Sequence, residues 1–500
     1  MTRSSAAYLK SLNDNRSVFL NGKAIENVTT HPAYQQAAKS IANLYDFQGA
    51  PENLERMTYQ SPKTGNRVGR MWQLPTNYEE LVNRREALTT WAETHYGFMG
   101  RSPDHVASTL AGFYMGSHVY AQHGSERVAA VEQYYEYARD NDLYISYVII
   151  DPQGDRSKSR SENGNADLTV SICDEDSEGI TIKGAKMLGT GAVLSDEVLV
   201  STLRPMNKGE EKWAFTAVLP INVKGLKLLS RRSYEESTTS LFDYPLSKRF
   251  DENDALLYFD EVKVPWHRIF VNGNIETQFA QWHNTPAHSY QNYQAEIRLT
   301  VKLRFLVGLA KRIAEMTGAI KFPQVVEKLG YVSSQLQVIE AFVYAMETKG
   351  WNFGAYYLPN KELLYASQVQ SQRLYPKVID TVRDLAGGGM IMLPSSIEDF
   401  HDSEVAELIG KTQYSPAASS EERVKFFKLA WDAIGSEFGS RHTQYEMFYS
   451  GPRVVTTGMA FRTFQWERTT DLVDDCLRSY ESPSSTSLTS VVPPTRGINQ

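Results

Sequence analysis

The chain has 500 residues, of which 41% are hydrophobic and 22% are charged, and these values are typical of a soluble globular protein of two to three domains. The formal net charge of -7 excludes the basic surface that binding to nucleic acid or to an anionic membrane requires. No stretch reaches the roughly 20 apolar residues that cross a bilayer, and the N-terminus has no apolar signal core, so a cytoplasmic protein is expected.

Residues 1–145 are predicted to form a mostly helical N-terminal domain, with helices near 31–45, 79–96 and 126–140. Within it, the run GRSPD (100–104) places Arg101 two residues before a proline and just ahead of a helical apolar pattern. A guanidinium at a helix entrance suits an anionic or electron-rich group such as a phenolate, a flavin ring or a phosphate. The same run also fits a plain helix cap by Asp104, with Arg101 lying over it.

Residues 146–274 change to short β-like runs separated by Gly, Asn, Asp and Pro, which predicts a β-barrel or sandwich as the middle domain. Residues 275–480 return to long helices, with an apolar seam between Leu329 and Met346 and a capping box of Ser419 and Glu422. The Ser/Pro/Thr-rich residues 481–500 are expected to be a flexible tail. A cofactor cleft is expected where the three domains meet.

Several standard signatures are absent from the sequence: there is no GxGxxG fingerprint, P-loop, HExxH or G-x-S-x-G elbow. The two cysteines, Cys173 and Cys476, match no metal-binding spacing, so no metal site is expected.

Six segments nevertheless stand out along the chain: GRSPD (100–104), DPQ…R (151–156), GAKMLGTGAVLSDEVLV (184–200), PLSKRFDENDALLYFDEVKVPWHRIF (245–270), LAGGGMIMLPS (385–395) and SEFGSR (436–441). Taken in order, they resemble the two-component FAD-dependent aromatic hydroxylases of the 4-hydroxyphenylacetate 3-monooxygenase type, oxygenase component. The resemblance implies an acyl-CoA-dehydrogenase-like fold: mainly α, with an N-terminal helical domain, a middle β-barrel and a C-terminal four-helix bundle that builds a homotetramer.

The resemblance also implies an activity. A separate reductase supplies reduced FAD, and the protein uses it with O2 to hydroxylate an aromatic, phenolic small molecule through a flavin hydroperoxide. Arg101 is then a catalytic residue that contacts both flavin and substrate. The residues that the resemblance assigns to FAD are Asp151, Gln153, Arg156, Thr190, Gly191, Gly388, Ser436, Phe438 and Arg441. Each also has a structural alternative, such as a β-turn at Thr190–Gly191, a surface ion pair for Arg156 or a helix C-cap near Gly388.

The chain departs from its relatives where the substrate would bind. His105 stands where many members have tyrosine, Tyr147 stands where a phenol-contacting histidine is common, and residues 292–294 (Asn-Tyr-Gln) stand where many carry a histidine base. Either His105 is the base, with its position exchanged with Tyr147, or the substrate needs no deprotonation. The predicted substrate-binding residues are therefore Arg101, His105, Tyr147, Tyr293 and Gln294, with Arg101 and His105 catalytic.

Two other functions are compatible with this fold. One is a 4-hydroxybutyryl-CoA-dehydratase-like lyase, which needs an iron–sulfur cluster for which two cysteines are too few. The other is a flavin-binding protein without catalysis, which the missing family histidines leave open.

Overall fold

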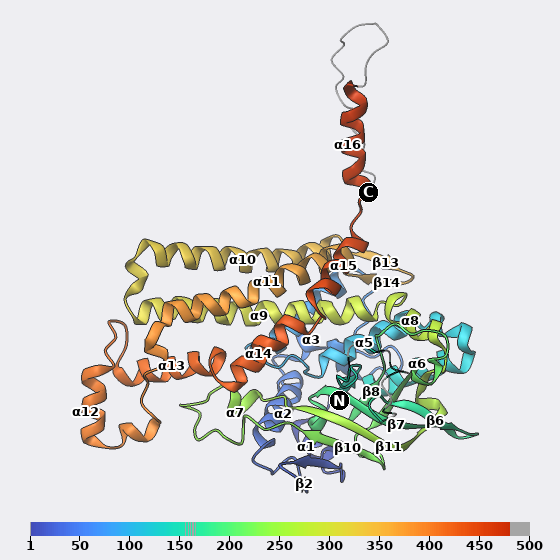
Figure 1. Ribbon diagram of the computed structural model, residues 1–500, viewed down its shortest axis with the longest axis horizontal. Helices are drawn as coiled ribbons and strands as arrows, with labels where there is room; N and C mark the ends of the chain where they lie inside the picture. Colours follow the sequence, from blue (N-terminus) through green and yellow to red (C-terminus); the bar gives the residue numbers. More distant parts are fainter. Residues whose placement is uncertain are drawn as a thin grey trace.

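The computed structural model describes residues 2–155, 157, 158, 160, 162, 165 and 167–480. A helical N-terminal part, a β module and a set of long helices follow one another along the chain (Figure 1). The N-terminal helices confirm those expected near 31–45, 79–96 and 126–140. They are α1 (Ser5–Ser11), α2 (Gln35–Gly49), α3 (Leu54–Met57), α4 (Tyr78–Thr94), α5 (Asp104–Met115) and α6 (Ser125–Asp140), with the hairpin β3 (Thr58–Gln60) and β4 (Arg67–Gly69).

The β module consists of two sheets. The larger has the order β2-β1-β10-β11-β7-β6, and the smaller has the order β12-β9-β8-β5. A single bridge between Ile150 and Met187 links them, so the strands of the described residues form two joined sheets and not a closed barrel. The strands are β1 (Val18–Leu20), β2 (Lys23–Ile25), β5 (Ile145–Val148), β6 (Ser171–Glu175), β7 (Gly179–Thr190), β8 (Glu197–Val200), β9 (Phe215–Pro220), β10 (Leu226–Ser230), β11 (Asp254–Pro265) and β12 (Ile269–Asn272).

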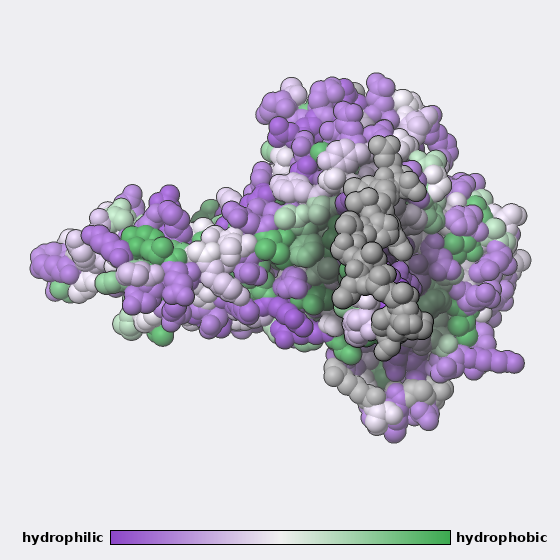
Figure 2. Space-filling view, turned by 90° about the horizontal axis from the view of Figure 1, so that it is seen from above, coloured by the Kyte–Doolittle hydropathy of each residue, from purple (hydrophilic) through white to green (hydrophobic). Residues whose placement is uncertain are grey.

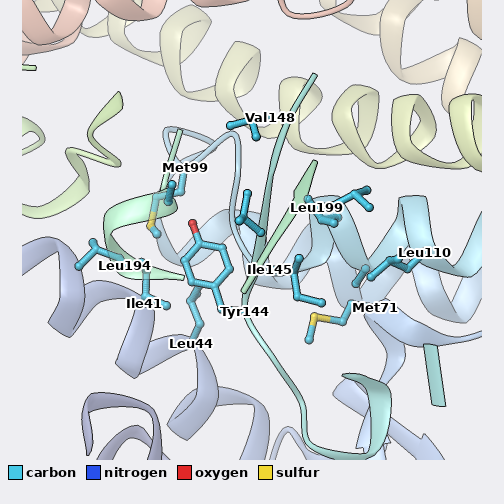
Figure 3. Packing of buried hydrophobic residues seen from close by; sticks show 14 of the residues in the cluster. Ile41, Leu44, Met71, Met99, Leu110, Tyr144, Ile145, Val148, Leu194 and Leu199 are labelled. Carbon is cyan, nitrogen blue, oxygen red and sulfur yellow. The ribbon is translucent and has the colours of Figure 1, made fainter. Parts of the chain in front are cut away.

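The N-terminal part and the β module share a strand contact and a core. Strand β1 pairs in parallel with β10, with Val18 opposite Leu228, so residues before α2 complete the larger sheet. Figure 3 shows Tyr144, directly before β5, packed near Ile41 and Leu44 of α2, and Ile145 of β5 on the side of Leu110 of α5. Because these side chains exclude water together, the two parts hold each other in place.

The long helices α9 (Ala287–Met316), α10 (Pro323–Thr348) and α11 (Lys361–Ala386) lie side by side (Figure 1). The predicted seam lies on α10, where Val332, Ile339, Val343 and Met346 are buried. The predicted capping box of Ser419 and Glu422 is confirmed at the start of α13. The remaining elements are α7 (Ser247–Phe250), α8 (Ile275–His283), α12 (Ser403–Thr412), α13 (Ser420–Ile434), α14 (Glu437–Phe448), α15 (Arg453–Thr463) and α16 (Glu467–Tyr480), with the hairpin β13 (Trp351–Phe353) and β14 (Tyr356–Leu358).

The surface of the helical part carries many exposed apolar side chains. Apolar residues lie among polar ones on the elongated end of the molecule seen from above (Figure 2). Helix α16 stands away from the body in Figure 1 and buries none of its residues. None of the helices in the described part of the chain is long and apolar enough to cross a membrane.

Helix α5 lies unusually close to the start of α9. A Cβ added at Gly112 would lie 2.2 Å from the Ala287 Cα, and one added at Gly116 would lie 2.6 Å from the Thr285 Cβ. Only hydrogen fits between the two backbones at these positions. This contact fixes the spacing between the residues at the start of α5 and those on the first turns of α9.

We predict that Gly112→Ala lowers the free energy of unfolding by about 1–3 kcal/mol, because the methyl group must push α5 away from α9. Gly308→Ala is the matched control: it lies on the exposed side of α9 with nothing within 4 Å, so it should stabilise the helix by roughly 0.5–1 kcal/mol. Urea unfolding measures both values, and equal effects of the two substitutions would contradict the close-packing account.

Candidate active site

Two hydrogen bonds fix the backbone of Arg101. Its N–H donates to Glu252 Oε1 at 2.5 Å, and its carbonyl oxygen accepts from the Tyr144 hydroxyl at 2.8 Å. The guanidinium lies over the rings of Tyr147 and Tyr445, 5.2 Å from each centroid. The arginine is therefore held between aromatic faces by cation–π contacts.

The simple helix-cap interpretation of this segment is wrong. Helix α5 begins without a side-chain cap bond, and Asp104 instead faces inward. Its Oδ1 accepts from the Ser102 hydroxyl at 2.6 Å, and its Oδ2 accepts from Gln294 Nε2 at 3.0 Å. The GRSPD run thus directs a carboxylate toward α9 as well as an arginine toward the β module.

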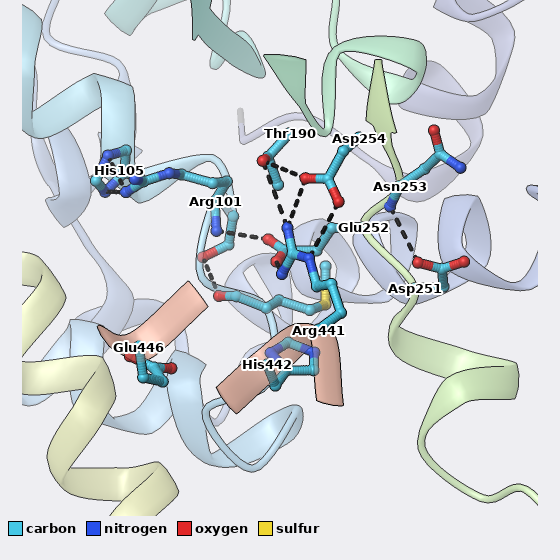
Figure 4. Close-up of polar contacts among 12 residues, drawn as sticks. Arg101, His105, Thr190, Asp251, Glu252, Asn253, Asp254, Arg441, His442 and Glu446 are labelled. Carbon is cyan, nitrogen blue, oxygen red and sulfur yellow. Dashed lines mark hydrogen bonds and ion pairs between the residues drawn. The ribbon is translucent and has the colours of Figure 1, made fainter. Parts of the chain in front are cut away.

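His105 lies in contact with four polar or aromatic side chains. Arg101 Nη1 is 2.5 Å from His105 Nε2 and 3.2 Å from Nδ1, as Figure 4 shows. Gln294 Oε1 lies 2.9 Å from Nδ1, and Gln291 Nε2 lies 2.9 Å from Nε2. The Tyr147 ring stacks on the imidazole at 5.4 Å, and its hydroxyl accepts from Gln291 Nε2 at 3.2 Å. The predicted residues Arg101, His105, Tyr147 and Gln294 therefore form one group.

The imidazole in this group is neutral. Burial and the adjacent Arg101 charge lower the pKa of His105 well below its usual value. His105 and Gln294 are fully buried, whereas Arg101 and Tyr147 are half-buried, so a ligand reaches the group from the side of Arg101 and Tyr147.

Tyr293 does not join this group. Its hydroxyl donates to Glu347 on α10, and burial with the Glu347 charge raises its pKa well above the usual value. The helical step of about 100° per residue turns it away from the face that carries Gln291 and Gln294. In this chain Tyr293 connects α9 to α10.

Thr190 and Gly191 lie where β7 ends, beside the Arg101 frame. Gly191 has φ +76°, and a Cβ there would lie 2.1 Å from the Tyr144 hydroxyl oxygen, so only glycine fits. The Thr190 hydroxyl donates to Asp254 Oδ1 at 2.5 Å (Figure 4). Arg441 from α14 binds the same carboxylate in a two-point ion pair of 2.6 and 3.0 Å. Its role toward a phosphate remains a prediction, since Asp254 already binds its Nε and Nη2.

Asp151 and Gln153 line a cavity of about 290 Å³ that begins at Ile149 and Ile150, directly after β5. Asp151 accepts from Lys186 at 2.6 Å and from Arg160 at 2.8 Å. Only 3% of each of these cationic side chains is exposed, and Arg160 Nη1 is buried without a partner among the described residues. Because these two buried cations share one carboxylate, the remaining positive charge favours an anionic or carbonyl-bearing ligand in this cavity. The predicted Arg156 lies outside the described residues.

The other predicted cofactor residues lie apart from Arg101. Ser436 caps α14 by accepting from the Gly439 N–H, and Phe438 stacks on Phe98 at 5.7 Å in the core. Gly388 lies at the exposed end of α11, and its neighbour Gly389 faces Arg423 of α13. Phe438 is linked to Arg101 only indirectly, because its ring contacts His442, which faces the Tyr445 ring beneath the Arg101 guanidinium.

A buried charge network supports the site from behind. Arg298 and Lys302 of α9 both bind Glu446 of α14, and none of the Lys302 or Glu446 side chain is exposed. Arg298 also lies over the Tyr445 ring, 5.6 Å from its centroid. Burial alone would raise the pKa of Glu446, but the charges of Arg298 and Lys302 lower it to about 2. The network joins α14, and with it Tyr445 and Arg441, to α9.

We predict that Glu446→Gln lowers the free energy of unfolding by about 3–5 kcal/mol at pH 6, where Lys302, with a pKa of about 8, is charged and loses its counter-ion. The difference in free energy of unfolding between wild type and variant should shrink as pH falls from 4.5 toward 2. Over that range Glu446, whose pKa is lowered in the folded state, becomes protonated and its stabilising charge is lost. Denaturant unfolding at several pH values measures the gap.

Glu437→Gln on the same helix is the control, since Glu437 forms an exposed pair with Arg232 and should change stability by less than about 1 kcal/mol. A gap of similar size for both variants, or one that does not narrow in acid, would contradict this interpretation.

Sequence reasoning missed several residues of the site. Gln291, Glu252, Asp254, Tyr445 and Arg160 all contact predicted site residues or line the cavity. Gln291 could have been found from its position one helical turn before Gln294. The carboxylates at 252 and 254 lie inside the quoted segment 245–270 and could have been matched to Arg441 as counter-charges.

The chain belongs to the 4-hydroxyphenylacetate 3-hydroxylase family. Its residues 4–271 match the family model for the N-terminal region, and residues 279–478 match that for the C-terminal region. It is 32% identical to the 4-hydroxyphenylacetate 3-monooxygenase oxygenase component of Geobacillus sp. strain PA-9, over 93% of this chain and 94% of that protein. It is 34% identical to the pyoverdin chromophore biosynthetic protein PvcC of Pseudomonas aeruginosa, over 95% of each chain.

Solved structures give the same result. The oxygenase component of 4-hydroxyphenylacetate 3-monooxygenase complexed with FAD superimposes with a TM-score of 0.90 at 30% identity, covering 96% of this chain and all of that one. This confirms the predicted mainly α, acyl-CoA-dehydrogenase-like fold. An archaeal 4-hydroxybutyryl-CoA dehydratase has a TM-score of 0.86 at 21% identity, which shows that it shares the fold.

Proposed function

We propose that this protein is the oxygenase component of a two-component, FAD-dependent monooxygenase that hydroxylates a phenolic small molecule. The observation that carries the proposal is the group of Arg101, His105 and Tyr147, in which a fixed cation, a neutral imidazole and an aromatic face lie within contact distance. This is the chemistry that recognises a phenol. Family membership supports it, as does a related structure solved with FAD and 4-hydroxyphenylacetate.

The residues around the cavity fit FAD. Among the described residues, Arg160 Nη1 is a buried donor without a partner, and it can bind a carbonyl or anionic ring atom. Gly191, whose Cβ would meet the Tyr144 hydroxyl, lets the end of β7 lie against the Arg101 frame. Asp151, Gln153, Arg160, Thr190 and Gly191 are the residues that would hold the flavin ring and its chain. The reduced cofactor would supply the electrons with which one oxygen atom of O2 is transferred and the other leaves as water.

The chain's own residues prepare the substrate. Arg101 is a permanent charge held over Tyr147, so it stabilises negative charge that develops on a phenolic oxygen. His105 offers a neutral imidazole nitrogen beside that charge, and Tyr147 offers a ring on which an aromatic substrate packs. Burial of His105 and Gln294 excludes water from the inner end of the site.

Three further parts of the proposal concern its partners and place. A separate flavin reductase supplies the reduced FAD, which agrees with the description of the relatives as an oxygenase component. The protein acts in the cytoplasm. It assembles as a homotetramer through its apolar helical faces. The exposed apolar residues that support assembly are Phe322, Val326 and Val338 of α10 and Leu472, Val473 and Leu477 of α16.

Light scattering on the purified protein tests the assembly. We expect a mass of four chains, because isolated exposed apolar faces of this extent favour burial against another copy. A mass of one chain at micromolar concentration would contradict it.

The function itself is tested with reduced FAD, O2 and a panel of phenols, by measuring hydroxylated product and hydrogen peroxide together. We predict that Arg101→Ala binds FAD and folds normally but forms product about 10²-fold more slowly, because the charge facing the phenolic oxygen is lost. The electrons of reduced FAD then reduce O2 to hydrogen peroxide instead.

Arg127→Ala is the control. Arg127 lies on α6, with its guanidinium carbon 4.7 Å from the centroid of the Trp266 ring, and its loss should leave the product-to-peroxide ratio unchanged. Unchanged coupling in Arg101→Ala would remove Arg101 from the mechanism. Peroxide alone from the wild type with every phenol would favour a flavin-binding protein without this activity.

A further inference from the structure

A chain of hydrogen bonds runs from Arg101 through His105 and Gln294 to Asp104. Arg101 Nη1 lies 2.5 Å from His105 Nε2, His105 Nδ1 lies 2.9 Å from Gln294 Oε1, and Gln294 Nε2 lies 3.0 Å from Asp104 Oδ2. All members except Arg101 are buried, and the chain crosses from α5 to α9 and back. It lies entirely within one protomer.

The two ends of this chain determine the direction of every bond between them. A guanidinium has only donors, so the His105 nitrogen nearer to it, Nε2 at 2.5 Å compared with Nδ1 at 3.2 Å, must accept. A carboxylate has only acceptors, so Gln294 must present its NH₂ group to Asp104 and its oxygen to His105. His105 Nδ1 must then donate, so the single N–H proton of the neutral imidazole lies on Nδ1.

Gln291 supports the same assignment from another direction. Its amide oxygen accepts from the Thr109 hydroxyl at 3.1 Å, which leaves its NH₂ group to face both His105 Nε2 and the Tyr147 hydroxyl. Two donors, Arg101 and Gln291, therefore converge on Nε2. An N–H at that atom would face both of them and be left without an acceptor.

We propose that Asp104 and Gln294 fix His105 as the Nδ1-protonated tautomer, so that its Nε2 lone pair, beside the Arg101 guanidinium, accepts the proton of the substrate hydroxyl when that hydroxyl takes the place of the Gln291 N–H. The proposal rests on the proposed function for the identity of the substrate as a phenol. Asp104 and Gln294 act through His105 and are positioning residues. This also accounts for the loss of the family histidines, since Nε2 of His105 takes over their part.

The proton transfer balances without a further reactant. The hydroxyl O–H bond breaks, its proton goes to Nε2, and the electron pair stays on the oxygen as a phenolate that faces Arg101. The imidazolium then carries protons on both nitrogens, and its Nδ1–H still donates to Gln294. The phenolate supplies the negative charge that the Arg101–His105 pair lacks when the substrate is absent.

The tautomer can be measured in the full-length protein without flavin or substrate. Solid-state NMR of sedimented protein labelled with ¹⁵N-histidine distinguishes N–H from lone-pair nitrogens in each ring, and His105→Gln identifies the His105 signals among the ten histidines. We expect one neutral tautomer, with the proton on Nδ1. A proton on Nε2, or a doubly protonated ring at pH 7, would overturn the proposal.

Gln294→Met removes the link to Asp104 at nearly constant size, so we expect the Nε2-protonated form to appear. Gln291→Met is the matched control one turn earlier on the same helix; it removes a donor to Nε2 but leaves the link, so the proton should stay on Nδ1. If Gln294→Met fails to fold, Asp104→Asn replaces it, because an amide no longer dictates the direction of the chain. An unchanged tautomer in the folded variant would overturn the proposal.

Kinetics then test the role of Nε2. With Gln294→Met, the rate of product formation should fall by about 10²-fold for a phenol of ordinary pKa and much less for a ring-fluorinated phenol that is already ionised at the assay pH. An equal loss for both phenols would overturn the base role. If the wild type forms no product with any phenol, the proposed function is contradicted. The NMR measurement would still decide whether Asp104 and Gln294 fix the His105 tautomer.

Discussion

The site depends on the close contact between α5 and α9. Two glycines on α5, Gly112 and Gly116, let its backbone meet the residues that lead into α9. That contact sets the distance at which His105 and Asp104, on one helix, meet Gln291 and Gln294, on the other. A methyl group at the contact would separate the two helices, and the hydrogen bonds that join His105 and Asp104 to Gln291 and Gln294 lie beyond it along the same pair.

Electrostatics imposes the second constraint. The protein buries several cations near one another, and each is offset by a carboxylate: Arg441 by Asp254, Arg298 and Lys302 by Glu446, and Arg160 and Lys186 by Asp151. Arg101 differs, because its guanidinium contacts a neutral imidazole and two aromatic rings, while Glu252 binds its backbone. A cation whose side chain lacks a bound carboxylate is ready for an anionic ligand. Among the cations named here, Arg101 is therefore the one suited to the reaction.

Local parts of the fold could be predicted from the sequence. The helix after GRSPD, the α10 seam and the Ser419–Glu422 capping box follow from short-range rules of spacing and capping. Pairings between distant segments could not: β1 joins β10 across about 200 residues, and nothing in the three-residue strand indicates its partner. The strand runs of the middle domain predicted a β-barrel or sandwich, and the resemblance a β-barrel, but strand order is a property of the whole chain, and the described strands form two linked sheets.

The candidate site was predicted in part for a related reason. The resemblance marked Arg101, His105, Tyr147 and Gln294, and they do meet. The first half of α9 is buried on nearly all sides, so no apolar stripe shows which side chains face α5 and which face α10. Tyr293 was therefore placed with the substrate although it binds Glu347, and Gln291 was overlooked although it bridges His105 and Tyr147.

The most direct test of the central claim is a crystal structure of the protein with FAD and a bound phenol. The account predicts that the phenolic oxygen lies within hydrogen-bond distance of both the Arg101 guanidinium and His105 Nε2, with the aromatic ring against Tyr147. A phenol bound with its oxygen elsewhere, while Arg101 keeps its contact with His105, would contradict it.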